Sequence, residues 1–123
     1  MRILAISVDA LPGRELSPNS RCHWSAKMKA KQVYKHAVWA EAYQVRPAEP
    51  FAKARLNLTF VFPDKRRRDR DNILSSFKPG QDALVLAGWI KDDNSECLTL
   101  GEVRIEVDKA RAPRTQIELV EVS

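Results

Sequence analysis

The chain has 123 residues, of which 21 are lysine or arginine and 16 are aspartate or glutamate, so its net charge is +5. This length suits one folded domain with its own core, and a hydrophobic content of 44% excludes a disordered chain. No stretch approaches the roughly 20 apolar residues that a membrane span needs, and the start lacks the pattern of a signal peptide. We therefore expect a single cytoplasmic domain over residues 1–123.

The first half of the chain predicts a strand, a loop and a long helix. Residues 2–8 are rich in branched apolar side chains and favour a strand, whereas the prolines and glycine of residues 11–24 favour a loop. A helix is expected over residues 25–43, with Ser25 as its N-cap. Its buried face should carry the small apolar residues that recur at helical spacing, namely Ala26, Ala30, Val33, Ala37 and Ala40.

A second face of this helix is basic. It carries three lysines at positions i, i+4 and i+8, which are Lys27, Lys31 and Lys35. Such a stripe is either a solvated helix face or a ridge of phosphate contacts, and both interpretations stay open at this point.

The second half predicts a further strand, a broken helix and two strands. Residues 52–62 alternate in polarity, as expected of an inner strand. A helix should begin near Asp69 or Asp71, kink or break at Pro79-Gly80, resume over residues 81–87 and end at Gly88. After a turn at residues 89–96, residues 98–107 and 115–122 predict two strands. The order strand–helix–strand–helix–strand–strand indicates an α+β fold, a mixed sheet of about four strands with two helices packed on it.

Basic and acidic side chains alternate in the segment PDKRRRDRDN, residues 63–72. It contains five cations, Lys65, Arg66, Arg67, Arg68 and Arg70. Clusters of this kind favour a polyanionic partner, most often nucleic acid, although a solubilising surface has the same composition.

Carboxylates in and after the same segment offer ligands for a hard cation. Asp69 and Asp71 lie at a strand-to-helix junction, and Asp92 and Asp93 lie on the turn after that helix. Three converging aspartates would suffice for Mg²⁺, which activates water and stabilises charge on a phosphodiester. The alternative is that these acids form ordinary surface ion pairs, which contribute little.

Taken together, the segments PDKRRRDRDN, DAL and AGWIKDD resemble the RusA-type Holliday junction resolvases. The segment LSPNSRCHWSAKMKAKQ resembles the N-terminal part of that family more loosely, so the likeness extends over nearly the whole chain. The resemblance implies a RusA-like nuclease domain that requires Mg²⁺, with Mn²⁺ as the alternative ion. It also implies a homodimer that binds four-way DNA junctions and nicks two opposed strands symmetrically in recombination and repair. The family occurs in cells and in resident phages.

The resemblance also implies roles for individual residues. The essential aspartates of the family fall on Asp69, Asp71 and Asp93, as metal ligands and catalytic groups, with Asp92 as the neighbour that could be confused with Asp93. The family's helical lysine falls on Ser75 when counted forward from Asp71 and on Lys78 when counted back from DAL, so we infer an insertion of about one turn and assign the role to Lys78.

The basic residues of the same region are assigned to DNA. Arg68 matches a basic position of the family, and we expect the DNA-binding set to be Lys65, Arg66, Arg67, Arg68, Arg70, Lys27, Lys31 and Lys35.

Three alternatives remain at this stage. The first is a junction-binding or DNA-binding protein with impaired catalysis, for which the shifted lysine leaves room. The second is a metal nuclease that acts on other branched nucleic acid, and the third is a structural domain with a charged surface.

Overall fold

Alternating apolar residues form four strands in a computed structural model that describes residues 1–123. They are β1 (Ile3–Val8), β2 (Ala54–Phe62), β3 (Leu98–Val107) and β4 (Arg114–Glu121). The strands make one mixed sheet in the order β1-β4-β2-β3, in which β2 and β3 are parallel and the other neighbours are antiparallel. The expected α+β fold, with β2 as an inner strand, is therefore confirmed.

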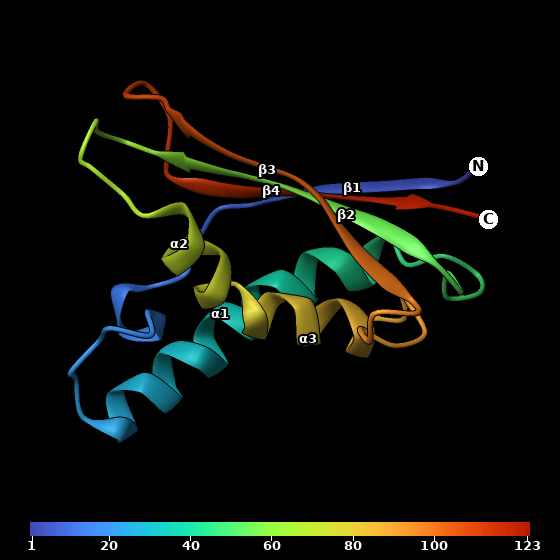
Figure 1. The fold of residues 1–123 in the computed structure, drawn as a ribbon, viewed down its shortest axis with the longest axis horizontal. Helices are drawn as coiled ribbons and strands as arrows, with labels where there is room; N and C mark the ends of the chain where they lie inside the picture. Colours follow the sequence, from blue (N-terminus) through green and yellow to red (C-terminus); the bar gives the residue numbers. More distant parts are fainter.

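The helices cover one face of this sheet, as Figure 1 shows. They are α1 (Trp24–Gln44), α2 (Arg70–Ser76) and α3 (Lys78–Leu86), and a short 3-10 helix, η1 (Arg14–Leu16), lies in the loop after β1. The core lies between the helices and the sheet, where Phe60, Leu84 and Trp89 are almost completely buried.

The buried face of α1 differs from the face that the alanine spacing predicts. Val33 is 63% exposed, whereas Tyr34, Val38 and Ala42 are buried. Burial of the large Tyr34 side chain removes more apolar surface from water than burial of an alanine, so Tyr34 determines which face packs on the core. The N-cap also differs, because His23 rather than Ser25 caps the helix, accepting a hydrogen bond from the Ser25 backbone N–H at its Nδ1.

A break in the second helix is confirmed, but it lies at Phe77 and not at Pro79-Gly80, so α3 begins at Lys78 rather than at Gln81. Pro79 lies in the first turn of α3, where its missing N–H costs no helical hydrogen bond. The Phe77 ring is buried and meets the rings of Tyr34 and Phe60 edge-on, each at a centroid distance of 6.1 Å. This ring fixes the junction of the two short helices against α1 and the sheet. Gly88, with φ of +84°, ends α3 as expected.

The parallel pair β2–β3 contains a shift in register, at which the Asn57 side chain forms hydrogen bonds. Its register shifts between Leu56 and Leu58. The Asn57 amide oxygen accepts a hydrogen bond from the Glu102 backbone N–H at 2.8 Å, and its nitrogen donates to Glu118 at 2.8 Å. Gly101 lies against this amide, so a side chain at position 101 would displace it.

Candidate functional site

The basic segment after β2 forms a loop that Arg68 organises from within. The Arg68 guanidinium forms an ion pair with Asp64 and donates to the backbone carbonyls of Asp64 and Arg66 at 2.8 and 2.9 Å. It also stacks 3.8 Å from the centre of the Phe62 ring and is only 15% exposed. The Arg68 hydrogen bond holds the pKa of Asp64 below its usual range. Arg68 therefore stabilises the loop, and a contact with DNA would be a second role.

The remaining cations of the loop face solvent. Arg66 is 78% exposed and keeps only a loose ion pair with Asp64 at 3.5 Å. Lys65, Arg67 and Arg70 are also exposed. Because Arg68 is paired inside the loop, these four side chains carry the positive charge of the loop that is accessible from solvent.

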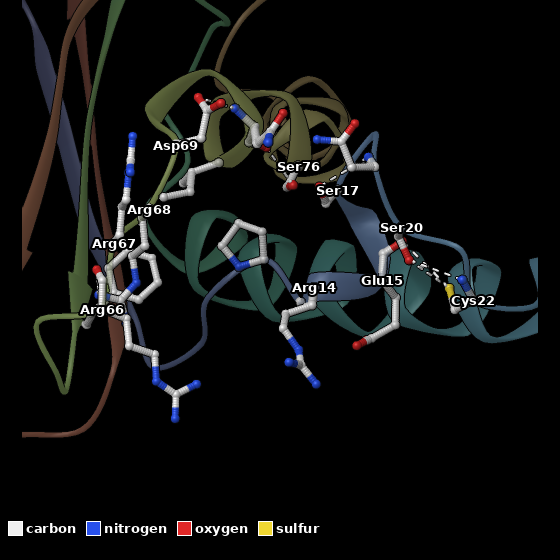
Figure 2. Close-up of a pocket in the computed structure, with 16 residues that line it drawn as sticks. Arg14, Glu15, Ser17, Ser20, Cys22, Arg66, Arg67, Arg68, Asp69 and Ser76 are labelled. Carbon is white, nitrogen blue, oxygen red and sulfur yellow. Dashed lines mark hydrogen bonds between the residues drawn. The ribbon is translucent and has the colours of Figure 1, made fainter.

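A pocket of about 690 Å³ separates this loop from the N-terminal segment. Residues 66–69 and the start of α2 form one wall, and residues between Pro12 and Cys22 form the other (Figure 2). Arg14 reaches this pocket from η1, so it adds a cation that sequence reasoning did not assign. The pocket is lined by arginines, by small hydroxyl and amide side chains and by two carboxylates, Glu15 and Asp69. The arginine, hydroxyl and amide groups are of the kinds that bind phosphate oxygens.

Asp69 and Asp71 occupy the start of α2 but differ in their surroundings. Asp69 is the N-cap, and its Oδ1 accepts the backbone N–H groups of Asp71 at 2.9 Å and Asn72 at 3.4 Å. Asp71 lies in the first turn and is exposed, where a carboxylate interacts favourably with the helix dipole. The capping role of Asp69 was one of the two alternatives that the sequence left open.

Asp93 and Lys78 meet although they are 15 residues apart. Lys78 Nζ donates to Asp93 Oδ2 at 2.6 Å and to Asp82 Oδ1 at 2.7 Å, and Gln81 donates to Asp93 at 3.2 Å. Hydrogen bonds to Asp82 and then to Asp93 raise the pKa of Lys78. The Lys78 hydrogen bond also lowers the pKa of Asp93 against the effect of partial burial. The structure thus places Lys78, rather than Ser75, beside this carboxylate.

The turn that carries Asp93 is anchored to the core. The Phe51 backbone N–H donates to the Trp89 carbonyl at 2.9 Å, and the Lys91 N–H donates to the Phe51 carbonyl at 3.1 Å. Asp92 accepts the Asp93 backbone N–H at 2.7 Å, so it shapes the turn. Asp93 is the member of the pair that faces α3.

The expected convergence of Asp69, Asp71 and Asp93 is not found. No three histidine, cysteine, aspartate or glutamate side chains lie close enough together to hold a metal ion. Asp69 accepts a backbone N–H group at the start of α2, whereas Asp93 accepts a hydrogen bond from Lys78. The donor chemistry still fits magnesium, which often takes one or two carboxylates together with waters and substrate phosphates. The aspartates are therefore of a residue type that binds Mg²⁺, but by themselves they do not form a complete set of ligands.

The lysine stripe lies on another element. Lys31 is exposed on α1, Lys27 and Lys35 are half-buried, and none of the three lines the pocket beside the arginine loop. Trp24, at the start of the same helix, is 71% exposed. Whether this stripe contacts phosphates stays a prediction.

None of the helices has both the length and the apolar composition that crossing a membrane requires.

Comparisons with known proteins found one distant relative. No family model matches the chain. An uncharacterized protein of Xylella fastidiosa (strain Temecula1 / ATCC 700964) is 36% identical over 85 residues. The match covers 66% of this chain and 56% of that protein, so the chain corresponds to little more than half of the relative's length.

Proposed function

We propose that this chain is a magnesium-dependent endonuclease that resolves four-way DNA junctions by paired, symmetric nicks. The contact between Lys78 and Asp93 carries the proposal, because it joins two positions that the resemblance to RusA-type resolvases marks as functional. The proposal includes a homodimer in the cytoplasm, since two symmetric cuts require two sites related by a twofold axis.

The charges of the site support a nucleic-acid substrate. The exposed cations of the loop, Lys65, Arg66, Arg67 and Arg70, can bind phosphates next to Asp69 and Asp71. Lys27, Lys31 and Lys35 would extend the contact along α1 when a branched substrate brings more than one arm to the protein. This distribution favours a large polyanion over a small acidic ligand.

The acidic residues and Lys78 would do the chemistry. Asp71 and Asp93, with Asp69, would supply carboxylate ligands to Mg²⁺ or Mn²⁺. Because the three do not converge in the chain alone, waters and substrate phosphates would have to complete the coordination. When bound, such an ion supplies positive charge at the phosphodiester and makes a bound water more acidic. The ammonium group of Lys78 would stabilise the charge that develops on the phosphate, at a point where it already lies beside Asp93. Asp69 would keep the α2 terminus, and with it Asp71, in position by capping.

Cleavage of a synthetic four-way junction in Mg²⁺ tests the proposal. We expect the native protein to cut opposite strands at matched positions, and Asp71→Asn to lose at least about 100-fold in rate while it still binds the junction. Glu41→Gln, which neutralises an exposed carboxylate of α1, is the matched control and should cut normally. Equal affinity for junction and linear duplex, with no cleavage, would refute the proposal.

A further inference from the structure

Lys78 lies between two carboxylates, and only one of them belongs to the predicted site. Its Nζ is 2.6 Å from Asp93 Oδ2 and 2.7 Å from Asp82 Oδ1. Asp82 lies one helical turn after Lys78 on α3, where its side chain is 32% exposed. The two carboxylates therefore share one ammonium group.

Helix stabilisation does not explain this pair. A lysine in the first turn of a helix lies at the positive end of the helix dipole, and an i,i+4 pair is weaker with the base first than with the acid first. A pair selected for helix stability would have the opposite order. The arrangement instead places the Lys78 ammonium group at the N-terminus of α3, next to the turn of Asp93. Asp82 and Asp93 both bind it there.

The two carboxylates belong to different elements of the fold. Asp82 belongs to α3, and the residues that follow it, Ala83 and Leu84, are buried in the core. Asp93 belongs to a turn, and Gln81 also donates to its Oδ2. If Asp93 binds another cation or a substrate group, Lys78 loses one partner, and Asp82 is the partner that remains on the same rigid helix.

We propose that Asp82 is a positioning residue, which holds the Lys78 ammonium group at the site while Asp93 is engaged with metal or substrate. Its contribution to catalysis rests on the proposed function, whereas its hold on Lys78 is a property of the folded chain. Asp82 itself touches neither substrate nor metal in this proposal. It acts through Lys78 alone.

The hold on Lys78 can be measured without any cleavage. In ¹⁵N NMR of the full chain, with the Lys78 ammonium signal assigned from Lys78→Met, we expect this signal to persist in Asp93→Asn. It should disappear by rapid exchange in the double variant Asp82→Asn/Asp93→Asn. Loss of the signal in Asp93→Asn alone would overturn the proposal, because Asp82 would then not retain Lys78.

A double-mutant cycle tests the role in catalysis. Asp82→Asn should lower kcat for junction cleavage about 10-fold with little change in KM, and Asp82→Glu should restore most of it. In a Lys78→Met background Asp82→Asn should cost no more than about 2-fold, because its partner is gone. A full 10-fold further loss there would overturn the proposal in favour of a structural role.

The NMR comparison and the cleavage assay distinguish failure of the proposed function from failure of the proposed role of Asp82. Absence of cleavage by the native protein would refute the proposed function, and the NMR comparison would then decide by itself whether Asp82 holds Lys78. Thermal unfolding of every variant, with Glu41→Gln as the control carboxylate, identifies any loss of activity that comes from unfolding.

Discussion

Gly80 should resist substitution by alanine although it lies inside a helix. A Cβ at this position would lie 2.6, 2.9 and 3.0 Å from three carbon atoms of the Phe77 ring. These separations are well below the contact distance of carbon atoms, so the ring or the backbone must move. The ring has little freedom to do so, because it is 1% exposed and packs edge-on against Tyr34 and Phe60.

Two opposing effects determine the sign of the change. Alanine in place of glycine favours a helix interior by about 1 kcal/mol. Overpacking a well-filled core typically costs about 1–3 kcal/mol. The closest of the three contacts is severe and the ring is enclosed, which favours the upper half of that range. We therefore expect Gly80→Ala to lower the free energy of unfolding by about 1–2 kcal/mol.

Denaturant unfolding followed by circular dichroism measures this change, and a second substitution tests its cause. Phe77→Leu removes the ring atoms that the new methyl group would meet, so Gly80→Ala should become neutral or stabilising in that background. A stabilised Gly80→Ala single variant would refute the reasoning, as would an equal loss in both backgrounds. Because Phe77 fixes the angle between α2 and α3, the single variant should also weaken any activity that needs Asp71 and Lys78 together.

Three further predictions concern the sheet, the end of α3 and the basic loop. Gly101→Ala should destabilise the fold by roughly 1–3 kcal/mol in denaturant unfolding, because the new methyl group displaces the Asn57 amide; wild-type stability would contradict this. Gly88→Ala should cost only about 1 kcal/mol by the same measurement, since its φ is +84° but nothing lies within 4 Å of the added carbon. The pKa of Asp64 is lowered in the folded chain, so the stabilisation from its pair with Arg68 is complete above about pH 4 and is lost as the pH falls through the lowered pKa. Amide hydrogen exchange in residues 64–69 should therefore show less protection, relative to the intrinsic rate, at pH 3 than at pH 6, and equal protection would exclude this role.

Local sequence patterns predicted the strands well because alternation depends on neighbouring residues. The strand expected at residues 98–107 has the bounds of β3, and Gly88 ends α3 as its position predicted. These features follow from backbone geometry and side-chain alternation within a few residues.

Long-range contacts explain why the predicted buried face of α1 was wrong. Small alanines at helical spacing say little about which face is buried, whereas the observed face depends on a distant partner. The hydroxyl of the buried Tyr34 donates to Thr115 Oγ1 at 3.0 Å, and Thr115 donates to the Ala10 carbonyl at 2.7 Å. A tyrosine can be buried at this position because β4 and the loop after β1 satisfy its hydroxyl group. The helix sequence contains no sign of those partners.

The residues around Asp93 and the arginine loop also divide into those that sequence spacing can predict and those that only the folded chain brings together. Counting residues back from DAL selected Lys78 as the candidate, and the structure places its ammonium group beside Asp93. Asp82 was not identified, although its i+4 spacing from Lys78 was a usable signal. Arg14 could not have been found, because only the folded chain brings η1 to the arginine loop.

The mixture of charges in residues 63–72 separates into two classes once the contacts are known. Asp64 and Arg68 neutralise each other and shape the loop, and Asp69 caps α2, so these three charges serve the fold. The charged side chains of the segment that are exposed are those of the four cations, Asp69 and Asp71. The Asp64–Arg68 pair and the Asp69 cap fix the backbone of the segment, so its exposed cations stay close together despite their mutual repulsion. The loop therefore concentrates four exposed cations around two exposed carboxylates, and the proposed binding of a polyanion together with a metal ion rests on this arrangement.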